Sequence, residues 1–363
     1  MKFSIARDPL LAALVKPLGL AATGHAIPIL SHFRVQAEAY LAFTATNLET
    51  EMTSQVDADI EEGGTMTIPA RKLADIVRAL PAGASIRLET IGHQAKITSG
   101  RSRFQVSTLT AEDYPLFNAQ EGWRSIACTP ETLLTLLTHV AYAQAKGDVR
   151  FYLNGLYLTH DEEHLIAVAT DGHRLASYQV PYQGNSEPFA IIIPSQAVAE
   201  IIRLLKDEAS CILEIAPSAL RLTLSASQIT TKLIDGRYPD YQRIIPASYQ
   251  HQARVDRETL RQALLRVRIL STEKLRGVTL NLDPGKITLK TTNTYQDQAE
   301  DVIDAETTAS DVRVGFQDEY LLDALQATSE EQVILRLNGS QGPMLIQGLG
   351  REEHIQIVMP MLT

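Results

Sequence analysis

The sequence has little cysteine and no long apolar run. Its 363 residues include only two cysteines, Cys128 and Cys211, too few for a disulfide framework or a cysteine-rich metal cluster. No stretch approaches the roughly 20 apolar residues that a membrane-spanning helix needs, and the N-terminal residues do not resemble a signal peptide. We therefore expect a cytoplasmic protein with no membrane partner, and we expect both cysteines to lie in the core.

The sequence also lacks an excess of positive charge. It has 33 Lys and Arg against 43 Asp and Glu, a formal net charge of −10, which by itself argues against nucleic acid as a partner. Residues 296–331, however, hold eleven acids and one base, so the rest of the chain sums to zero. Residues 66–103 and 254–276 carry net charges of +5 and +4. Such segregation allows one face to bind a polyanion, although a solvated helix face explains either run alone equally well.

Motifs for catalysis and nucleotide binding are missing as well. The sequence has no Walker A loop, no GxGxxG fingerprint and no EF-hand loop. His160 and His164 superficially resemble an HExxH zinc motif, but Asp161 follows the first histidine and both flanks are strand-like, which favours a polar hairpin turn. Asp171 and His173 lack the context of a catalytic nucleophile, which favours a turn or a binding element. We predict a non-catalytic protein that uses no cofactor and no metal.

Three sets of short segments recur along the chain. One set resembles helix starts, one resembles strands that end in Thr-Asn or Thr-Asp, and one resembles strands that run into helices. The sets begin near residues 8, 129 and 256, near residues 41, 165 and 287, and near residues 66, 191 and 312. Asn47, Asp171 and Asn293 end the second set, 124 and then 122 residues apart, and one third of the chain is 121 residues. One period shared by three sets indicates three copies of one domain.

Each copy combines helices with several strands. Residues 85–89 and 220–224 alternate apolar and polar side chains, the pattern of half-buried antiparallel strands. The crossover spacing of parallel βαβ units does not recur, so we predict an α+β fold in which two helices of each copy pack on antiparallel sheets. Polar connectors divide the chain into domains at residues 1–120, 121–247 and 248–363.

The repeat and several longer motifs together resemble one family, the bacterial DNA sliding clamp, which is the beta subunit of the DNA polymerase III holoenzyme. The motifs are SGRSRF at residues 99–104, VRFYLNG at 149–155, ATDGHRLA at 169–176, DGRYPDY at 235–241, STEKLRG at 271–277 and MPM at 359–361. The resemblance implies a head-to-tail homodimer that closes into a ring around duplex DNA. Twelve helices about 9 Å apart would leave a hole of about 25 Å, which holds a duplex without reading its bases.

The resemblance further implies a processivity factor that tethers the replicative DNA polymerase, the clamp loader ATPase and repair proteins. In the family these partners insert linear motifs into a hydrophobic pocket between domains two and three. The matching positions are Arg150, Leu153, Thr170, Gly172, His173, Arg174, Leu175, Pro239, Arg243, Ile244, Tyr320, Val358, Met359, Pro360 and Met361. For these residues taken singly, core packing is the alternative. For the whole protein, the alternative is a repeat-built peptide-binding scaffold that does not encircle DNA.

Two further sets of positions match the family. Those expected to contact duplex DNA, without sequence specificity, are Arg71, Arg78, Lys146, Tyr152 and Arg254. Those expected at the dimer interface are Lys72, Phe104, Val106, Ile269, Leu270, Glu300 and Asp301, with Lys72 able to pair with either acid. The chain departs from the family pattern at residues 24–25 and 195–196, where basic residues are usual, so the DNA contacts are the least defined part of the resemblance.

Overall fold

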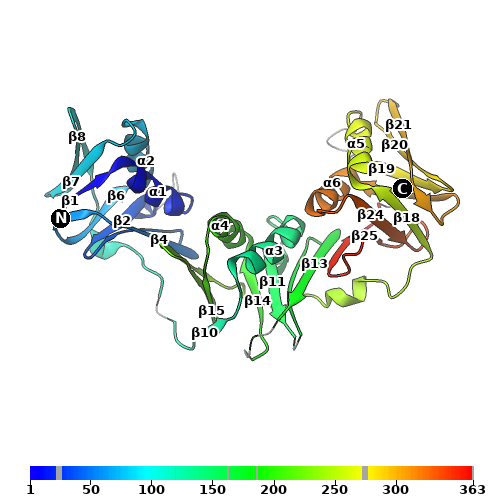
Figure 1. The fold of residues 1–363 in the computed structure, drawn as a ribbon, viewed down its shortest axis with the longest axis horizontal. Coiled ribbons are helices and arrows are strands. Elements are labelled where there is room, and N and C mark those ends of the chain that lie inside the picture. The colour runs from blue at the N-terminus through cyan, green and yellow to red at the C-terminus, as the bar shows by residue number, and fades with distance from the viewer. Residues whose placement is uncertain are drawn as a thin grey trace. The chain divides into compact units, whose positions relative to one another are not determined.

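The structure is a computed structural model that describes residues 1–21, 27–118, 120–161, 163–182, 184, 187–271 and 277–361. The chain divides into two compact units (Figure 1). Unit 1 comprises Met1–Glu131 and Ala199–Leu233, and unit 2 comprises Thr132–Val198 and Ile234–Thr363. Residues 24–25 and most of the 271–277 motif lie outside the described residues.

The described residues form six α-helices. They are α1 (Arg7–Leu18), α2 (Ala70–Ala79), α3 (Pro130–Val140), α4 (Ser195–Leu205), α5 (Arg257–Arg268) and α6 (Asp318–Ala327). All three recurring helix starts found in the sequence begin a helix within one or two residues of the predicted position. All three recurring strand-to-helix segments form a strand followed directly by α2, α4 or α6.

Unit 1 contains two antiparallel sheets. The first has the order β5-β1-β7-β8-β9 and the second the order β10-β15-β16-β17-β4-β3-β2-β6. The strands are β1 (Lys2–Ala6), β2 (His32–Ala37), β3 (Leu41–Thr46), β4 (Thr50–Val56), β5 (Asp59–Glu62), β6 (Gly64–Pro69), β7 (Ser85–Ile91), β8 (Gln94–Ser99), β9 (Ser102–Ser107), β10 (Arg124–Ile126), β15 (Ile212–Ala216), β16 (Ala219–Thr223) and β17 (Ser227–Lys232). The pairing of β17 with β4 therefore continues the sheet of the first repeat into the second.

Helices α1 and α2 lie side by side over the strands of unit 1 (Figure 1). Helix α1 packs against β3 and β4. Its buried residues are Leu10, Ala13, Leu14 and Pro17, a spacing that puts all four on one face of the helix. This face of α1 thus supplies part of the core, whereas Asp8, Pro9, Ala12 and Val15 are exposed.

Unit 2 also contains two antiparallel sheets. Their orders are β14-β11-β12-β13-β26-β25-β24-β18-β22 and β21-β20-β19-β23. The strands are β11 (Gly155–His160), β12 (His164–Thr170), β13 (Arg174–Pro181), β14 (Ala190–Pro194), β18 (His251–Asp256), β19 (Gly277–Asp283), β20 (Lys286–Thr292), β21 (Gln298–Asp304), β22 (Glu306–Thr307), β23 (Val312–Gln317), β24 (Gln332–Leu337), β25 (Met344–Gly348) and β26 (His354–Val358). The pairing of β13 with β26 continues the sheet of the second repeat into the third.

Helix α5 begins at a capped end and packs on the strands of the third repeat. The backbone N–H of Thr259 donates to the Asp256 carboxylate at 2.7 Å, the N-cap bond that satisfies a free helix donor. Leu260, Ala263 and Leu264 are buried together against the core of unit 2. The α+β fold predicted from the sequence is confirmed.

The same polar corner closes a hairpin in each repeat. Asn47 Oδ1 accepts the backbone N–H of Thr50 at 2.8 Å between β3 and β4. Asp171 Oδ1 accepts the N–H of Arg174 at 3.0 Å between β12 and β13. Asn293 Oδ1 accepts the N–H of Asp297 at 3.0 Å just before β21. A short side-chain acceptor that bonds the backbone two to four residues on stabilises a tight turn, which explains why these residue types recur at one period.

Two minor predictions have opposite outcomes. β11 and β12 pair antiparallel with His160 opposite Leu165, so the His160–His164 segment is a hairpin turn as predicted, with Glu162 outside the described residues. The prediction that Cys128 and Cys211 lie in the core is wrong, because both are only half-buried. They follow β10 and precede β15, at strand ends, where the Cys211 Sγ lies 3.7 Å from the Cys128 carbonyl oxygen.

The helices of the described residues are all too short or too polar to span a membrane. In the same part of the chain, no group of three or more His, Cys, Asp and Glu side chains has the arrangement of a metal site.

Candidate functional site

The C-terminal segment of unit 2 is held by backbone hydrogen bonds to the β12–β13 corner and to β23. The N–H of Met359, directly after β26, donates to the carbonyl oxygen of His173 at 2.8 Å. Two residues on, the N–H of Met361 donates to the carbonyl oxygen of Gly315 at 2.8 Å. These two bonds fix the Met-Pro-Met segment beside the β12–β13 corner, where the sequence places most of the partner-peptide positions.

Arg174 is the most constrained side chain of this region. Its side chain is only 10% exposed, and it forms ion pairs with Asp171 at 3.1 Å and with Asp323 at 2.5 Å. Its guanidinium carbon lies 4.6 Å from the ring centre of Tyr320 and 5.4 Å from that of Tyr142, within the range of a cation–π contact. Arg174 therefore holds Tyr320 and Tyr142 in place along one side of the site. Its own charge is already balanced by Asp171 and Asp323.

The charges around Arg174 outweigh its burial. Burial lowers the pKa of the guanidinium, but the hydrogen bond to Asp323 and the charge of Asp171 raise it, and the net effect is a raised pKa. Burial of the neighbouring Tyr142 hydroxyl raises the pKa of that group as well. Neither group changes its protonation near neutral pH, so the Arg174 guanidinium stays charged and the Tyr142 hydroxyl stays neutral.

The exposed face of the region is apolar and aromatic. The rings of His173 and Tyr320 stack with centres 6.3 Å apart. Met359 and Met361 are 37% and 39% exposed, and Ile244 is 37% exposed. Methionine is flexible and polarisable and adapts to different apolar partners. Such a face is typical of a surface that binds the apolar side chains of a ligand.

Gly172 allows Arg150 to approach the corner. Its φ of +88° lies in the left-handed region, and a Cβ at this position would lie 3.0 Å from the terminal nitrogens of Arg150. Arg150 donates to the carbonyl oxygen of Asp171 at 3.2 Å and pairs with Asp148 at 2.8 Å. Hydrogen bonds from Arg150 lower the pKa of the Asp148 carboxyl to about 2. The left-handed φ favours glycine at this position.

The structure does not expose every residue expected in the pocket. Leu153, Thr170, Leu175 and Val358 are each no more than 4% exposed, so they shape the site from beneath. Pro239 and Pro360 are half-buried. Arg243 is exposed and pairs with Asp240 at 2.7 Å.

Sequence reasoning missed Asp323 and Tyr142, the two residues that complete the surroundings of Arg174. Asp323 lies on α6, 149 residues from Arg174. Tyr142 follows α3 and its hydroxyl donates to Gln356 at 2.8 Å. Both contacts depend on how distant segments pack, and no local pattern in the sequence marks either residue.

The positions expected to contact DNA are distributed over both units. In unit 1, Arg71 and Arg78 are exposed on α2, and Arg78 pairs with Asp75 at 2.7 Å. In unit 2, Lys146 is exposed and Tyr152 is half-buried in a 3-10 turn. Arg254 lies on β18, and its guanidinium is 3.7 Å from the Glu306 carboxylate.

The positions expected at the dimer interface differ in exposure. Ile269 is 78% exposed directly after α5, and Leu270 is half-buried beside it. Phe104 is half-buried and Val106 is 9% exposed on β9. Lys72 is exposed on α2.

The acids expected to pair with Lys72 already have partners within the chain. Asp301 pairs with Arg266 at 2.6 Å, and Glu300 pairs with Lys290 at 2.5 Å. A bond from Lys72 would therefore share or displace an existing cation.

Comparison with known proteins identifies the family. Residues 1–118, 128–240 and 242–362 match the N-terminal, central and C-terminal domains of the DNA polymerase III beta subunit. The beta sliding clamp of Pseudomonas putida is 36% identical over 368 residues, covering 99% of this chain and 100% of the relative, and that of Escherichia coli is 34% identical over 364 residues with the same coverage.

Solved structures agree with the sequence comparison. The crystal structure of the DNA polymerase III subunit beta from Pseudomonas aeruginosa matches with a TM-score of 0.94 and 34% identity over 100% of both chains. A second structure of that protein, bound to griselimycin, matches equally well. The fold, the threefold repeat and the full-length similarity together show that this chain belongs to the DNA polymerase III beta subunit family, the beta sliding clamps.

Proposed function

We propose that this protein is a DNA sliding clamp, a non-catalytic processivity factor that encircles duplex DNA and tethers the replicative polymerase. The observation that carries the proposal is the match of three successive domains of one family, in order, to a chain whose structure repeats three times. The relatives are named for the same role. A repeat-built scaffold that does not encircle DNA is not favoured, because the similarity extends over the full length of clamps.

The ring is proposed to be a head-to-tail homodimer. Each chain would contribute the exposed Ile269 and the half-buried Leu270 to one end and Phe104 and Val106 to the other. A contact between two different surfaces closes into a ring when each chain supplies half of the circle. We also propose that each chain consists of three domains, at residues 1–120, 121–247 and 248–363.

DNA contacts are proposed to be electrostatic and non-specific. Arg71 and Arg78 on α2, together with Lys146, Tyr152 and Arg254, are the proposed contacts. Basic side chains attract the phosphates of DNA without reading its sequence. Because a ring holds DNA topologically, each contact can be weak enough to permit sliding. A cytoplasmic location fits this role.

Partner proteins are proposed to bind at the Met-Pro-Met groove, which we define by His173, Arg174, Tyr320, Met359 and Met361. Its exposed apolar face is suited to a short linear motif from the polymerase, the clamp loader or a repair protein. A relative, the Pseudomonas aeruginosa sliding clamp, has been crystallised with the ligand griselimycin, which supports the proposal that proteins of this family bind ligands. The remaining family-matched residues would support this face from beneath or from its edges.

Topological retention tests the proposed function. Protein loaded on nicked circular plasmid by a clamp loader and ATP is expected to co-elute with the DNA in gel filtration at high salt. Linearising the plasmid with a restriction enzyme is expected to release the protein, because it slides off the ends. Equal retention on circular and linear DNA would show that binding is not topological, and a protein that is monomeric well above micromolar concentration would count against the ring.

Weakening the support of Arg174 is expected to reduce partner affinity. Asp323→Asn removes one of two charges that hold the guanidinium, so Arg174 and the Tyr320 ring lose order. We expect a labelled peptide from the polymerase to bind about tenfold more weakly, since a hydrogen bond to a charged group is worth about 1.5–3 kcal/mol. Fluorescence anisotropy measures it. Asp207→Asn, an exposed carboxylate in unit 1, is the matched control, and an equal loss in both variants would contradict the role of Asp323.

A further inference from the structure

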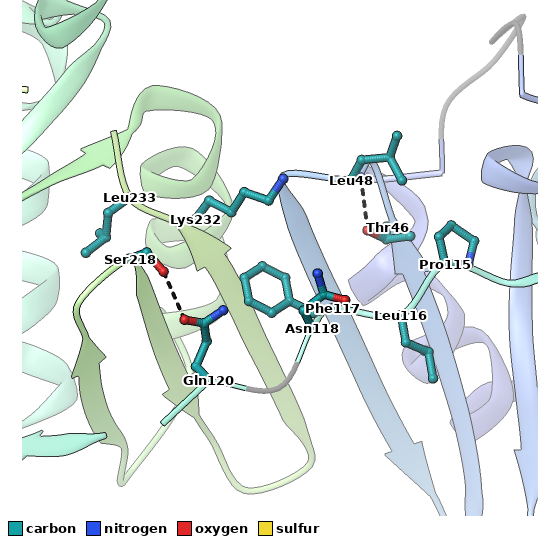
Figure 2. A pocket seen from close by; sticks show the side chains of 10 residues that line it. All are labelled: Thr46, Leu48, Pro115, Leu116, Phe117, Asn118, Gln120, Ser218, Lys232 and Leu233. Carbon is teal, nitrogen blue, oxygen red and sulfur yellow. Dashed lines mark hydrogen bonds between the residues drawn. The ribbon is translucent and has the colours of Figure 1, made fainter. Parts of the chain in front are cut away.

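Unit 1 contains a cavity at the place where the sheet of the first repeat meets that of the second. Its volume is about 380 Å³, within the range of ligand pockets. It is lined by the β3–β4 corner, by the segment that follows Tyr114 and by the ends of β16 and β17 (Figure 2). We call it the first-seam groove and define it by Leu48, Leu116, Phe117 and Lys232.

The first-seam groove is built on the same strand register as the Met-Pro-Met groove. β4 pairs with β17 as β13 pairs with β26. At the end of the first pair the N–H of Lys232 donates to the carbonyl oxygen of Glu49 at 2.9 Å, and at the end of the second the N–H of Met359 donates to that of His173 at 2.8 Å. Glu49 and His173 are 124 residues apart, one repeat period. The two grooves are therefore equivalent positions of the repeat.

Leu48 has a backbone conformation that a leucine adopts only at a cost. Its φ is +76°, in the left-handed region that disfavours side chains with a Cβ. The equivalent residue of the second repeat is Gly172, at φ +88°. The Leu48 side chain is 39% exposed, so its own burial does not offset the strain. The left-handed conformation belongs to the repeated corner, and in the first repeat it holds a large apolar side chain at the groove where the second repeat has none.

Two further apolar side chains, those of Leu116 and Phe117, line the same groove as Leu48. The N–H of Phe117 donates to the Glu51 carboxylate at 2.8 Å, and Glu51 is itself partly buried on β4. Leu116 is 49% exposed and Phe117 half-buried. In Figure 2 the Phe117 ring lies between Lys232 on one side and Gln120 on the other. The bond to Glu51 fixes the backbone at Phe117 before any ligand binds. A binding site that is ordered in advance loses less conformational entropy when a ligand binds.

The two ends of the groove are polar. The Lys232 ammonium lies 3.3 Å from Glu49, and both side chains are more than half exposed. An exposed ion pair of this kind contributes little, so a carboxylate of a ligand can replace Glu49. At the other end the Ser218 hydroxyl donates to the Gln120 side-chain oxygen at 2.9 Å. The groove thus has an apolar middle with one exchangeable cation at its edge.

We propose that the first-seam groove binds a short extended peptide of a partner protein, with at least two large apolar side chains and one acidic side chain. The apolar side chains would contact Leu48, Leu116 and Phe117, and the acid would contact Lys232. The equivalence with the Met-Pro-Met groove favours a peptide, and the single cation favours an acidic one. This goes beyond the proposed function, which places partner peptides at the Met-Pro-Met groove, and it does not depend on encirclement of DNA.

Selection from a phage-displayed library of random nonapeptides against the full-length protein tests the inference. We expect one class of selected peptides to be rich in Leu or Phe with an Asp or Glu. Its affinity is expected to fall at least about thirtyfold with Leu48→Gly, the size of a hot-spot loss. Leu48→Gly removes the side chain and relieves the strained backbone, so it is expected to fold. Lys232→Gln is expected to weaken the same class and to reduce its dependence on salt.

Matched variants separate the two grooves. Lys286→Gln, on an exposed position of β20, controls for loss of a lysine, and Met359→Ser controls for binding at the Met-Pro-Met groove. The inference is overturned if every selected peptide keeps its affinity in Leu48→Gly, or if all of them bind more weakly to Met359→Ser. It is also overturned if Leu48→Gly alters only self-association, which would make a second copy of the chain the occupant. Failure of the ring test leaves all these outcomes unchanged.

Discussion

Replacing Ile269 with aspartate is expected to convert the proposed dimer into monomers. Ile269 is 78% exposed in the isolated chain, and its position is one that the resemblance to the clamp family assigns to the dimer interface. In the dimer the new carboxylate would be buried without a cation. Burying an unpaired charge costs about 3 kcal/mol or more, which weakens the dimer by roughly a hundredfold or more.

Sedimentation equilibrium over a range of concentrations measures this effect. The control is Ile212→Asp, because Ile212 is also strongly exposed, at 56%, but lies on β15, away from the expected interface positions. We expect Ile212→Asp to keep the dimer affinity of the unmodified protein. An unchanged dimer affinity in Ile269→Asp would refute the placement of the interface at this end of the chain. Retention on circular DNA should be lost together with the dimer.

Deleting residues 359–363 is expected to abolish binding of partner peptides and to leave the dimer intact. The deletion removes Met359 and Met361, which supply exposed apolar surface, and the two backbone bonds to His173 and Gly315. It ends the chain after Val358, so β26 and its pairing with β13 are kept. Loss of the apolar contacts of both methionines is expected to reduce peptide affinity by about a thousandfold, beyond the range of the titration, since truncating each anchor residue of an interface costs about 2 kcal/mol or more.

Peptide titration and dimer affinity are measured on the same truncated sample. Met359→Ser is the milder companion variant and is expected to retain an intermediate peptide affinity with an unchanged backbone. A truncated protein that binds the polymerase peptide as tightly as the full chain would place the partner site elsewhere. A truncated protein that no longer dimerises would show that the segment has a structural role beyond the groove.

The repeated corners show which parts of the fold can be predicted from sequence. Asn47, Asp171 and Asn293 each bond the backbone a few residues on, so their effect is local and their spacing gives the repeat directly. The helix starts are local as well, as Asp256 illustrates with its bond to the Thr259 N–H. Local hydrogen bonds and apolar periodicity were enough to predict three α+β copies.

The rest of the site depends on long-range packing. The sequence does not reveal that Asp323 pairs with Arg174, because the two residues meet only after α6 packs near β13. It does not reveal the strain at Leu48 either, since a leucine after Asn47 is compatible with many turns. The pairing of β17 with β4 joins strands that are far apart in the chain, and no periodicity encodes that register.

Several acids of the acidic segment, residues 296–331, form ion pairs within unit 2. Glu300, Asp301 and Asp323 pair with Lys290, Arg266 and Arg174. Part of the charge that makes the chain acidic is therefore balanced by bases inside unit 2. The net charge of a chain is a poor guide to the charge of any one face.

The strand pairs that cross from one repeat to the next make the repeats units of sequence but not units of folding. Cutting the chain at the ends of the second repeat would leave the outer backbone groups of β17 and β13 without their partner strands. Open edges of this kind recruit other strands and promote aggregation. A single repeat is therefore expected to be a poor independent protein, and an ancestral single-repeat protein would have needed to pair its edges with further copies of itself. Continuation of the sheet from one repeat into the next is thus part of what stabilises each repeat, before any DNA is considered.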